Sequence, residues 1–124
     1  MGLYEVLFWI GRILLGGFFF MMGINHFINA KSMIPYAQAK GVPAPSLAVY
    51  VTGLLLLLGG LSVIVGTYVT IGLWLLVIFL VPTTFIMHRF WQEEDPNARM
   101  AEQVNFMKNL ALLGAVLMLL YFWR

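Results

Sequence analysis

Polar side chains that could bind a ligand or exchange a proton stand out in this chain, because the segments that carry them are otherwise apolar. They are Asn25 and His26 near the end of the first apolar segment, His88 and Trp91 at the end of the third, and Asn105, Lys108 and Asn109 at the start of the fourth. Near neutral pH, imidazole accepts or donates a proton. Lysine and asparagine donate hydrogen bonds to carbonyl or anionic oxygens, and tryptophan offers a flat apolar wall. Together these groups suit a quinone head group or a small oxyanion.

Helical spacing gathers these residues onto shared faces. Thr84, His88 and Trp91 are four and three residues apart, which predicts one face of a helix. In an antiparallel bundle, the ends of the first and third segments meet the start of the fourth at one depth. We therefore predict one pocket, in which His88 exchanges protons and Lys108 holds a negative charge. Taken singly, the histidines could be satisfied interfacial groups, with Lys108 and Arg89 only marking topology.

Metal, haem and nucleic acid are not expected partners. Two histidines at one membrane depth could be the axial ligands of a haem, but that requires both rings to point at one iron. No carboxylate within the apolar segments joins the histidines, and the chain has no cysteine, so we predict no other metal site. No basic run is present that would attract nucleic acid.

The elements that must position these residues are four long apolar segments. Hydrophobic residues make up 62% of the 124 residues and charged residues 10%, whereas soluble domains carry about 25% charged residues. Segments 3–27, 46–66, 70–90 and 104–123 are each long enough to cross a bilayer as a helix. We predict an all-α integral membrane bundle of four transmembrane helices, forming a single domain over residues 1–124. The first segment lacks a basic flank before Glu5, so we expect it to be retained rather than cleaved.

Two long loops, 29–45 and 92–103, are predicted to lie on the same side of the membrane. In the first loop, Ile34–Lys40 could form a short interfacial helix that ends at Gly41. This side carries most of the basic residues, and the positive-inside rule therefore places it in the cytoplasm of a cell (inner) membrane protein. Both termini would then lie outside.

Arg12 is the one charge expected deep within an apolar segment. It shares a helical stripe with Glu5, Gly16, Phe19, Gly23 and His26, and glycines on a stripe allow close helix packing. Arg12 could extend toward the terminal side or pair with a backbone carbonyl, so we expect a structural role. Small residues, including Ala111 and Ala115, could serve the bundle or a homo-oligomer.

Several short motifs, taken in order, resemble the DoxX-like family of small four-span membrane proteins. They are Gly11–Gly16, Gly23–Phe27, Tyr36-Ala37, Lys40–Pro45, Gly53–Leu55, Leu58–Gly60, His88–Trp91 and Phe106–Gly114. The chain departs from the family at Leu56, where relatives often carry an acidic residue, and at His26, where lysine is common. The first departure leaves Arg12 without the carboxylate that the resemblance would supply.

The resemblance implies a redox-linked membrane subunit. Some relatives are membrane subunits of thiosulfate:quinone oxidoreductases, and others are linked to complexes that handle thiol and oxidative stress. Our leading hypothesis is a membrane subunit of a quinone-linked oxidoreductase system, with quinone as the expected cofactor and Asn25, His26, His88, Trp91, Asn105, Lys108 and Asn109 as its site. Two alternatives stay open: a non-catalytic anchor or assembly protein for a soluble redox partner at the long-loop side, and an oligomeric small-molecule carrier.

Overall fold

The computed structural model describes every residue from Met1 to Arg124 and contains only helices. These are α1 (Leu3–Ile28), α2 (Ala30–Ala39), α3 (Pro45–Val65), α4 (Val69–Met87), the 3-10 helix η1 (Phe90–Gln92) and α5 (Pro96–Trp123). Four helices, which begin at Leu3, Pro45, Val69 and Pro96, are long and apolar enough to cross a membrane. The predicted all-α membrane bundle is therefore confirmed.

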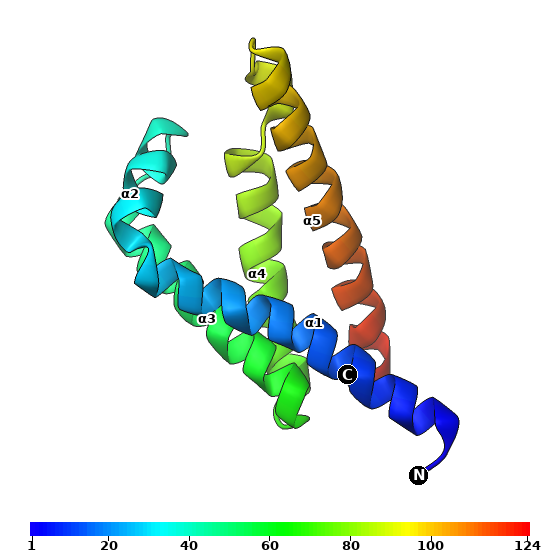
Figure 1. Ribbon diagram of the computed structural model, residues 1–124. Coiled ribbons are helices and arrows are strands. Elements are labelled where there is room, and N and C mark those ends of the chain that lie inside the picture. Colours follow the sequence, from blue (N-terminus) through cyan, green and yellow to red (C-terminus); the bar gives the residue numbers. More distant parts are fainter.

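The spans pack in sequence rather than as a closed ring. α1 packs on α3, α3 on α4, and α4 on α5, whereas α1 and α5 share no extensive contact. Figure 1 shows the result: α1 crosses the bundle obliquely, and α5 is separated from α1 along most of its length. The bundle therefore has an open seam between its first and last helices.

Glycines bring α1 and α3 into close contact. A Cβ atom on Gly16 would lie 2.7 Å from the Gly60 carbonyl oxygen, and one on Gly23 would lie 2.8 Å from that of Gly53. Because the bilayer provides little hydrophobic drive between helices, such close approach supplies the packing energy. Beside this contact lies a core that includes Phe19, Leu56, Leu73, Leu76, Leu80 and Val116, each fully buried.

The stripe predicted on α1 is confirmed over most of its length. Gly16, Phe19, Gly23 and His26 are the buried residues of this helix. Glu5 is exposed, because the first turns of α1 extend beyond the contact with α3.

Three helix boundaries differ from the sequence-based expectation. α2 begins at Ala30 rather than near residue 34. α4 ends at Met87, before the 3-10 turn that contains Trp91. α5 begins at Pro96 rather than near residue 104, because Asp95 accepts a hydrogen bond from the Ala98 amide and Pro96 is preorganised for the first turn. Hydropathy alone missed this start, since the first two turns of α5 are polar.

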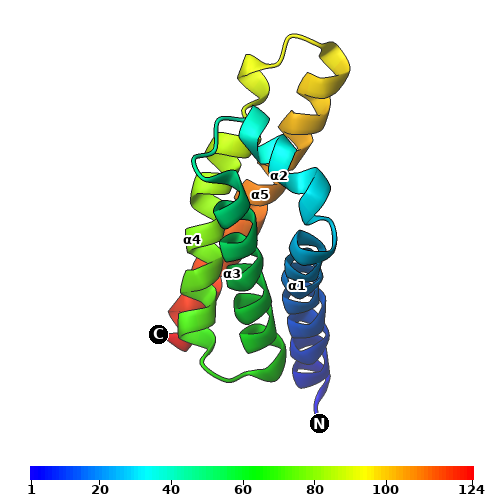
Figure 2. The same ribbon diagram turned by 90° about the vertical axis from the view of Figure 1, so that its left-hand side faces the viewer.

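α2 lies obliquely across the loop end of the bundle, as Figure 2 shows. Ala30 and Ala37 on this helix are buried and pack with Val49 of α3. At the opposite end, the turn after α3 uses Gly66 and Tyr68, both with positive φ. α2 thus forms a cover over one end of the bundle, while a tight turn closes the hairpin of α3 and α4 at the other.

Candidate functional site

A cavity of about 460 Å³ lies beneath α2 and between the loop ends of α1, α3, α4 and α5. Its volume falls within the range typical of small-molecule sites, about 300–1,000 Å³. Apolar walls come from residues such as Met22, Val49, Phe79 and Ile86, and polar groups from His26, Tyr36, His88, Asn105, Lys108 and Asn109. The cavity therefore combines an apolar interior with a small set of converging polar side chains.

The structure brings five of the seven sequence-predicted site residues to this cavity. His26 arrives from α1, His88 from the end of α4, and Asn105, Lys108 and Asn109 from one face of α5. This grouping depends on the antiparallel order of the spans, which places the three helix ends at one depth.

Two predicted site residues lie outside the cavity. Asn25 is exposed, and its side chain accepts a hydrogen bond from the Asn29 amide on the outer side of α1. Trp91 is 47% exposed and packs on Phe90 and Phe106. The expectation that Thr84, His88 and Trp91 share a helical face is wrong, because α4 ends at Met87 and η1 turns the tryptophan away.

His26 and Asn109 form the buried polar floor of the cavity. The Nδ1 atom of His26 lies 2.8 Å from the Met22 carbonyl oxygen, which can only accept, so Nδ1 carries the hydrogen. The Nε2 atom has no hydrogen-bond partner within the chain, and the ring lies edge-on to Phe79. Asn109 is 3% exposed, yet its amide makes no hydrogen bond to protein. Both residues line the cavity, so each of these groups is available to bond a ligand or water there.

Lys108 brings a positive charge to the cavity without a neutralising carboxylate. Its ammonium group lies 5.7 Å from the centre of the Phe18 ring, and the ion pairs of the chain are all made by other residues. The cavity can therefore attract an anionic or strongly accepting oxygen from this side.

Glu102 joins the cavity to a polar network that the sequence analysis did not predict. Its carboxylate accepts from Lys40 at 2.8 Å, from Tyr36 at 3.1 Å and from Asn105 at 3.3 Å, and it lies 3.4 Å from His88 Nδ1. Glu102 lies just before the predicted fourth segment and contacts His88 but not His26, so the expectation that no carboxylate within the apolar segments joins the two histidines is not contradicted. The missed signal was the spacing of Glu102, Asn105 and Asn109 along one helical face, which becomes visible only when α5 begins at Pro96.

Lys40 and Tyr36 fix α2 to the ends of α4 and α5. Burial alone would lower the pKa of Lys40, but its hydrogen bonds to Glu102 and Glu93 outweigh that effect and raise it. Burial and the nearby charge of Glu102 raise the pKa of Tyr36. Arg89 adds a backbone contact, donating to the Lys40 carbonyl at 2.7 Å. Lys40 therefore stays charged and Tyr36 neutral at physiological pH.

Arg12 lies at the opposite end of the bundle, where it stabilises the C-terminus of α3. It donates to the carbonyl oxygens of Val63 and Ile64 at 3.0 and 3.1 Å, and its guanidinium lies 4.1 Å from the centre of the Trp9 ring. Of the two roles open from sequence, pairing with backbone carbonyls is the one observed. Leu56, about 10 Å earlier on α3, is fully buried in the core, so Arg12 does not depend on a carboxylate there.

Comparison with known proteins decides the family. The family model described as DoxX matches residues 7–89, about two thirds of the chain. The chain belongs to the DoxX family. No curated protein and no solved structure matches it. Membership suggests a multi-pass membrane protein associated with oxidoreductase systems.

The DoxX match covers α1 to α4, together with the first residues after α4, and therefore includes His26 and His88. Glu102, Asn105, Lys108 and Asn109 on α5 lie beyond it. The position of these α5 residues in the cavity is therefore shown by the structure of the chain and not by the family match. Within that structure, the histidines of the matched region and the amides of α5 enclose one cavity.

Proposed function

We propose that this chain is a membrane subunit of a quinone-linked oxidoreductase system and that the cavity beneath α2 binds the quinone head group. The observation that carries the proposal is a largely apolar cavity in which the His26 Nε2 atom, the Asn109 amide and the Lys108 ammonium have no hydrogen-bonding or ion-pairing partner within the chain. A small anion alone would not account for the apolar walls, which a ring and the start of its tail would cover.

The donors and acceptors of the cavity suit a quinone in both redox states. The Asn109 amide and Lys108 can donate to the two ring carbonyl oxygens. His26 presents an unprotonated Nε2, because its Nδ1 hydrogen is directed to Met22, and it can accept from a hydroxyl of the reduced ring. When bound, a quinone would accept two electrons from a donor in the membrane or in a soluble redox partner, and two protons from the loop side.

The proposed proton route connects the cavity with the loop side. His88 was the proton-exchanging residue predicted from sequence, and its Nδ1 atom lies 3.4 Å from the Glu102 carboxylate. Glu102 in turn contacts Tyr36 and Lys40 on α2, next to the aqueous loops. In this proposal, His26 contacts the quinone ring and His88 exchanges protons with the loop-side network.

In this proposal the protein lies in the cell membrane, with loops 29–45 and 92–103 on the cytoplasmic side. A soluble redox partner would dock there, which is also where the anchor hypothesis places its contact. Glu93 bonds Lys40, and Asp95 caps α5, so Glu94 and Arg99 are the exposed charges that remain for a partner in the second loop.

Equilibrium binding of a short-chain ubiquinone analogue to the purified protein in lipid nanodiscs tests the site. Asn109→Leu removes an amide inside the cavity, and Asn25→Leu removes one on the outer side of the neighbouring helix. We expect the Kd to rise about tenfold for Asn109→Leu, the effect of losing one good hydrogen bond in an apolar site. Asn25→Leu should bind like the wild-type protein. Equal affinities for the two variants would contradict the site assignment.

A further inference from the structure

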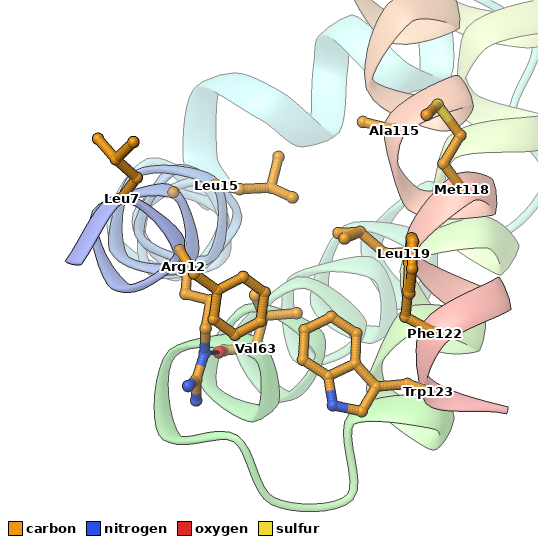
Figure 3. Close-up of a pocket in the computed structure, with 11 residues that line it drawn as sticks. Leu7, Arg12, Leu15, Val63, Ala115, Met118, Leu119, Phe122 and Trp123 are labelled. Carbon is orange, nitrogen blue, oxygen red and sulfur yellow. Dashed lines mark hydrogen bonds between the residues drawn. The ribbon is translucent and has the colours of Figure 1, made fainter. Parts of the chain in front are cut away.

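A second cavity, of about 420 Å³, lies between the first half of α1 and the last half of α5, at the end of the bundle opposite α2. Figure 3 shows its walls, in which Leu15 of α1 points toward Leu119 of α5, with Ala115, Met118 and Phe122 along the α5 side, while Leu7 projects from the other side of α1. Because α1 and α5 do not pack extensively, the cavity follows the open seam of the bundle. An apolar hollow that opens along a seam between spans is accessible to the hydrocarbon of the bilayer.

Arg12 is the one charged residue that lines this cavity. A guanidinium has five N–H groups; two of them donate to Val63 and Ile64, which leaves three without a partner in the chain. No carboxylate of the chain forms an ion pair with it. The two bonded carbonyls belong to the last turn of α3, so the guanidinium lies level with the end of that span.

Trp123 brings a second donor to the same end. Its ring stacks on Phe8 of α1, with the ring centres 5.5 Å apart, and so links the two sides of the cavity. In Figure 3, the indole nitrogen of Trp123 and the guanidinium of Arg12 both point toward the turn that follows α3. Two side-chain donors thus stand where the apolar walls end and the headgroup region of a bilayer begins.

We infer that this cavity binds an anionic glycerophospholipid. In the proposed topology, this lipid belongs to the outer leaflet. One acyl chain would lie along the apolar walls between α1 and α5. The phosphate would accept from the free N–H groups of Arg12 and from the Trp123 indole. Arginine suits this role, because its planar donor group can bond two phosphate oxygens at once.

Charge complementarity favours a lipid over a second copy of the chain. Glu5, in the first turn of α1, is the one acidic side chain at this end of the molecule, whereas the other four lie between η1 and the first two turns of α5. A partner copy could therefore supply little negative charge to Arg12. A phospholipid carries its charge at the depth of the guanidinium and its apolar chain beside the cavity walls.

Native mass spectrometry of the full chain in a mild detergent tests this inference, with phosphatidylglycerol and diacylglycerol of the same acyl chains as probes. We expect the wild-type protein to retain phosphatidylglycerol at least tenfold better than diacylglycerol. Arg12→Gln should abolish that preference, and Arg124→Gln should keep it, since Arg124 bonds the Tyr121 carbonyl and does not line the cavity.

A second pair of variants tests the cavity without touching the charge. Ala115→Leu fills space between α1 and α5 and should lower phosphatidylglycerol binding about tenfold, whereas Ala111→Leu adds the same volume on an exposed surface one turn earlier. Equal binding by these two variants would overturn the inference, even if Arg12→Gln fails to fold. Equal retention of phosphatidylglycerol and diacylglycerol by the wild-type protein would also overturn it. The same holds if the wild-type protein is a dimer and Ala115→Leu dissociates that dimer.

Discussion

Glu102 shows how a buried carboxylate is stabilised beside the bilayer. Only 8% of its side chain is exposed, and burial of an unpaired charge would cost several kcal/mol. Here four side chains from three parts of the structure surround it: Tyr36 and Lys40 from α2, His88 from the end of α4, and Asn105 from its own helix. The carboxylate therefore holds α2 over the cavity as well as completing the polar network.

Glu102→Gln should loosen α2, because the neutral amide cannot hold the Lys40 ammonium as the carboxylate does. We expect a loss of about 2 kcal/mol in the free energy of unfolding, typical of a hydrogen bond to a charged group. Faster hydrogen exchange of the α2 amides should accompany it. Mass spectrometry of exchanged peptides and thermal unfolding in detergent measure both effects.

Glu94→Gln is the matched control, because Glu94 is exposed and forms no ion pair. The pH dependence gives a second check. The folded pKa of Lys40 is raised, so its contribution is complete below the unfolded value of about 10.4 and is lost as the pH rises through the folded pKa. The difference between Glu102→Gln and wild type should therefore stay constant from pH 7 to about pH 9. Unchanged exchange of α2 would refute its attachment through Glu102.

Residue types identified most of the polar residues that line the cavity, but not its geometry. Polar side chains carry a free-energy cost in a bilayer, so those within apolar segments can be recognised from the sequence. This applies to His26, His88, Asn105, Lys108 and Asn109. The predicted position of Trp91 is wrong because the third segment is predicted to continue as a helix beyond Met87, where α4 ends. Glu102 was missed because it stands in a polar stretch, where an acidic residue carries no cost until the fold buries it.

At the scale of the elements, the contact between α1 and α3 depends on residues without side chains. Gly16 faces Gly60, and Gly23 faces Gly53, in each case with too little space for a Cβ atom. This approach positions His26 of α1 against α3, since a Cβ atom on Gly53 would lie 2.8 Å from the His26 Cβ atom. The depth of the cavity floor is therefore set by helix packing about one to three turns away.

Two adjacent glycines allow a direct test of this contact. A Cβ atom on Gly16 would lie 2.7 Å from the Gly60 carbonyl oxygen and from the Ile64 side chain, whereas one on Gly17 would meet nothing within 4 Å. Gly16→Ala should therefore lower the free energy of unfolding by about 1–3 kcal/mol through overpacking. Gly17→Ala should be neutral or slightly stabilising, because alanine favours the helix. Unfolding in mixed detergent, followed by circular dichroism, compares the two; an equal effect would contradict the close packing of α1 on α3.

Hydropathy predicted the number and approximate position of the spans, because lipid requires long apolar helices with satisfied backbones. It could not predict where α5 begins, since that depends on a local cap at Asp95 and a proline at the first turn. The seam between α1 and α5 could not be predicted from the sequence either. Four helices that are only weakly amphipathic can pack as a closed bundle or as an open one.

At the scale of the whole molecule, the two cavities lie at opposite ends and differ in chemistry. The cavity beneath α2 gathers histidine, amide and lysine side chains, while the one along the seam is apolar with a single arginine. Chemistry that exchanges protons with water would then be confined to the loop end. The function proposed here consequently depends on which side of the membrane that end faces.

The distribution of basic residues predicts that the loop end faces the cytoplasm. Lys31, Lys40, Arg89 and Arg99 lie in or beside the two long loops, against Arg12 and Arg124 at the other end. Because the chain has no cysteine, single cysteines report topology without background. Thr67→Cys, in the turn between α3 and α4, should react with a membrane-impermeant maleimide on intact cells. Glu94→Cys should react only after the membrane is permeabilised. The reverse pattern would place the polar cavity on the outer side and remove the cytoplasmic partner from the proposed electron path.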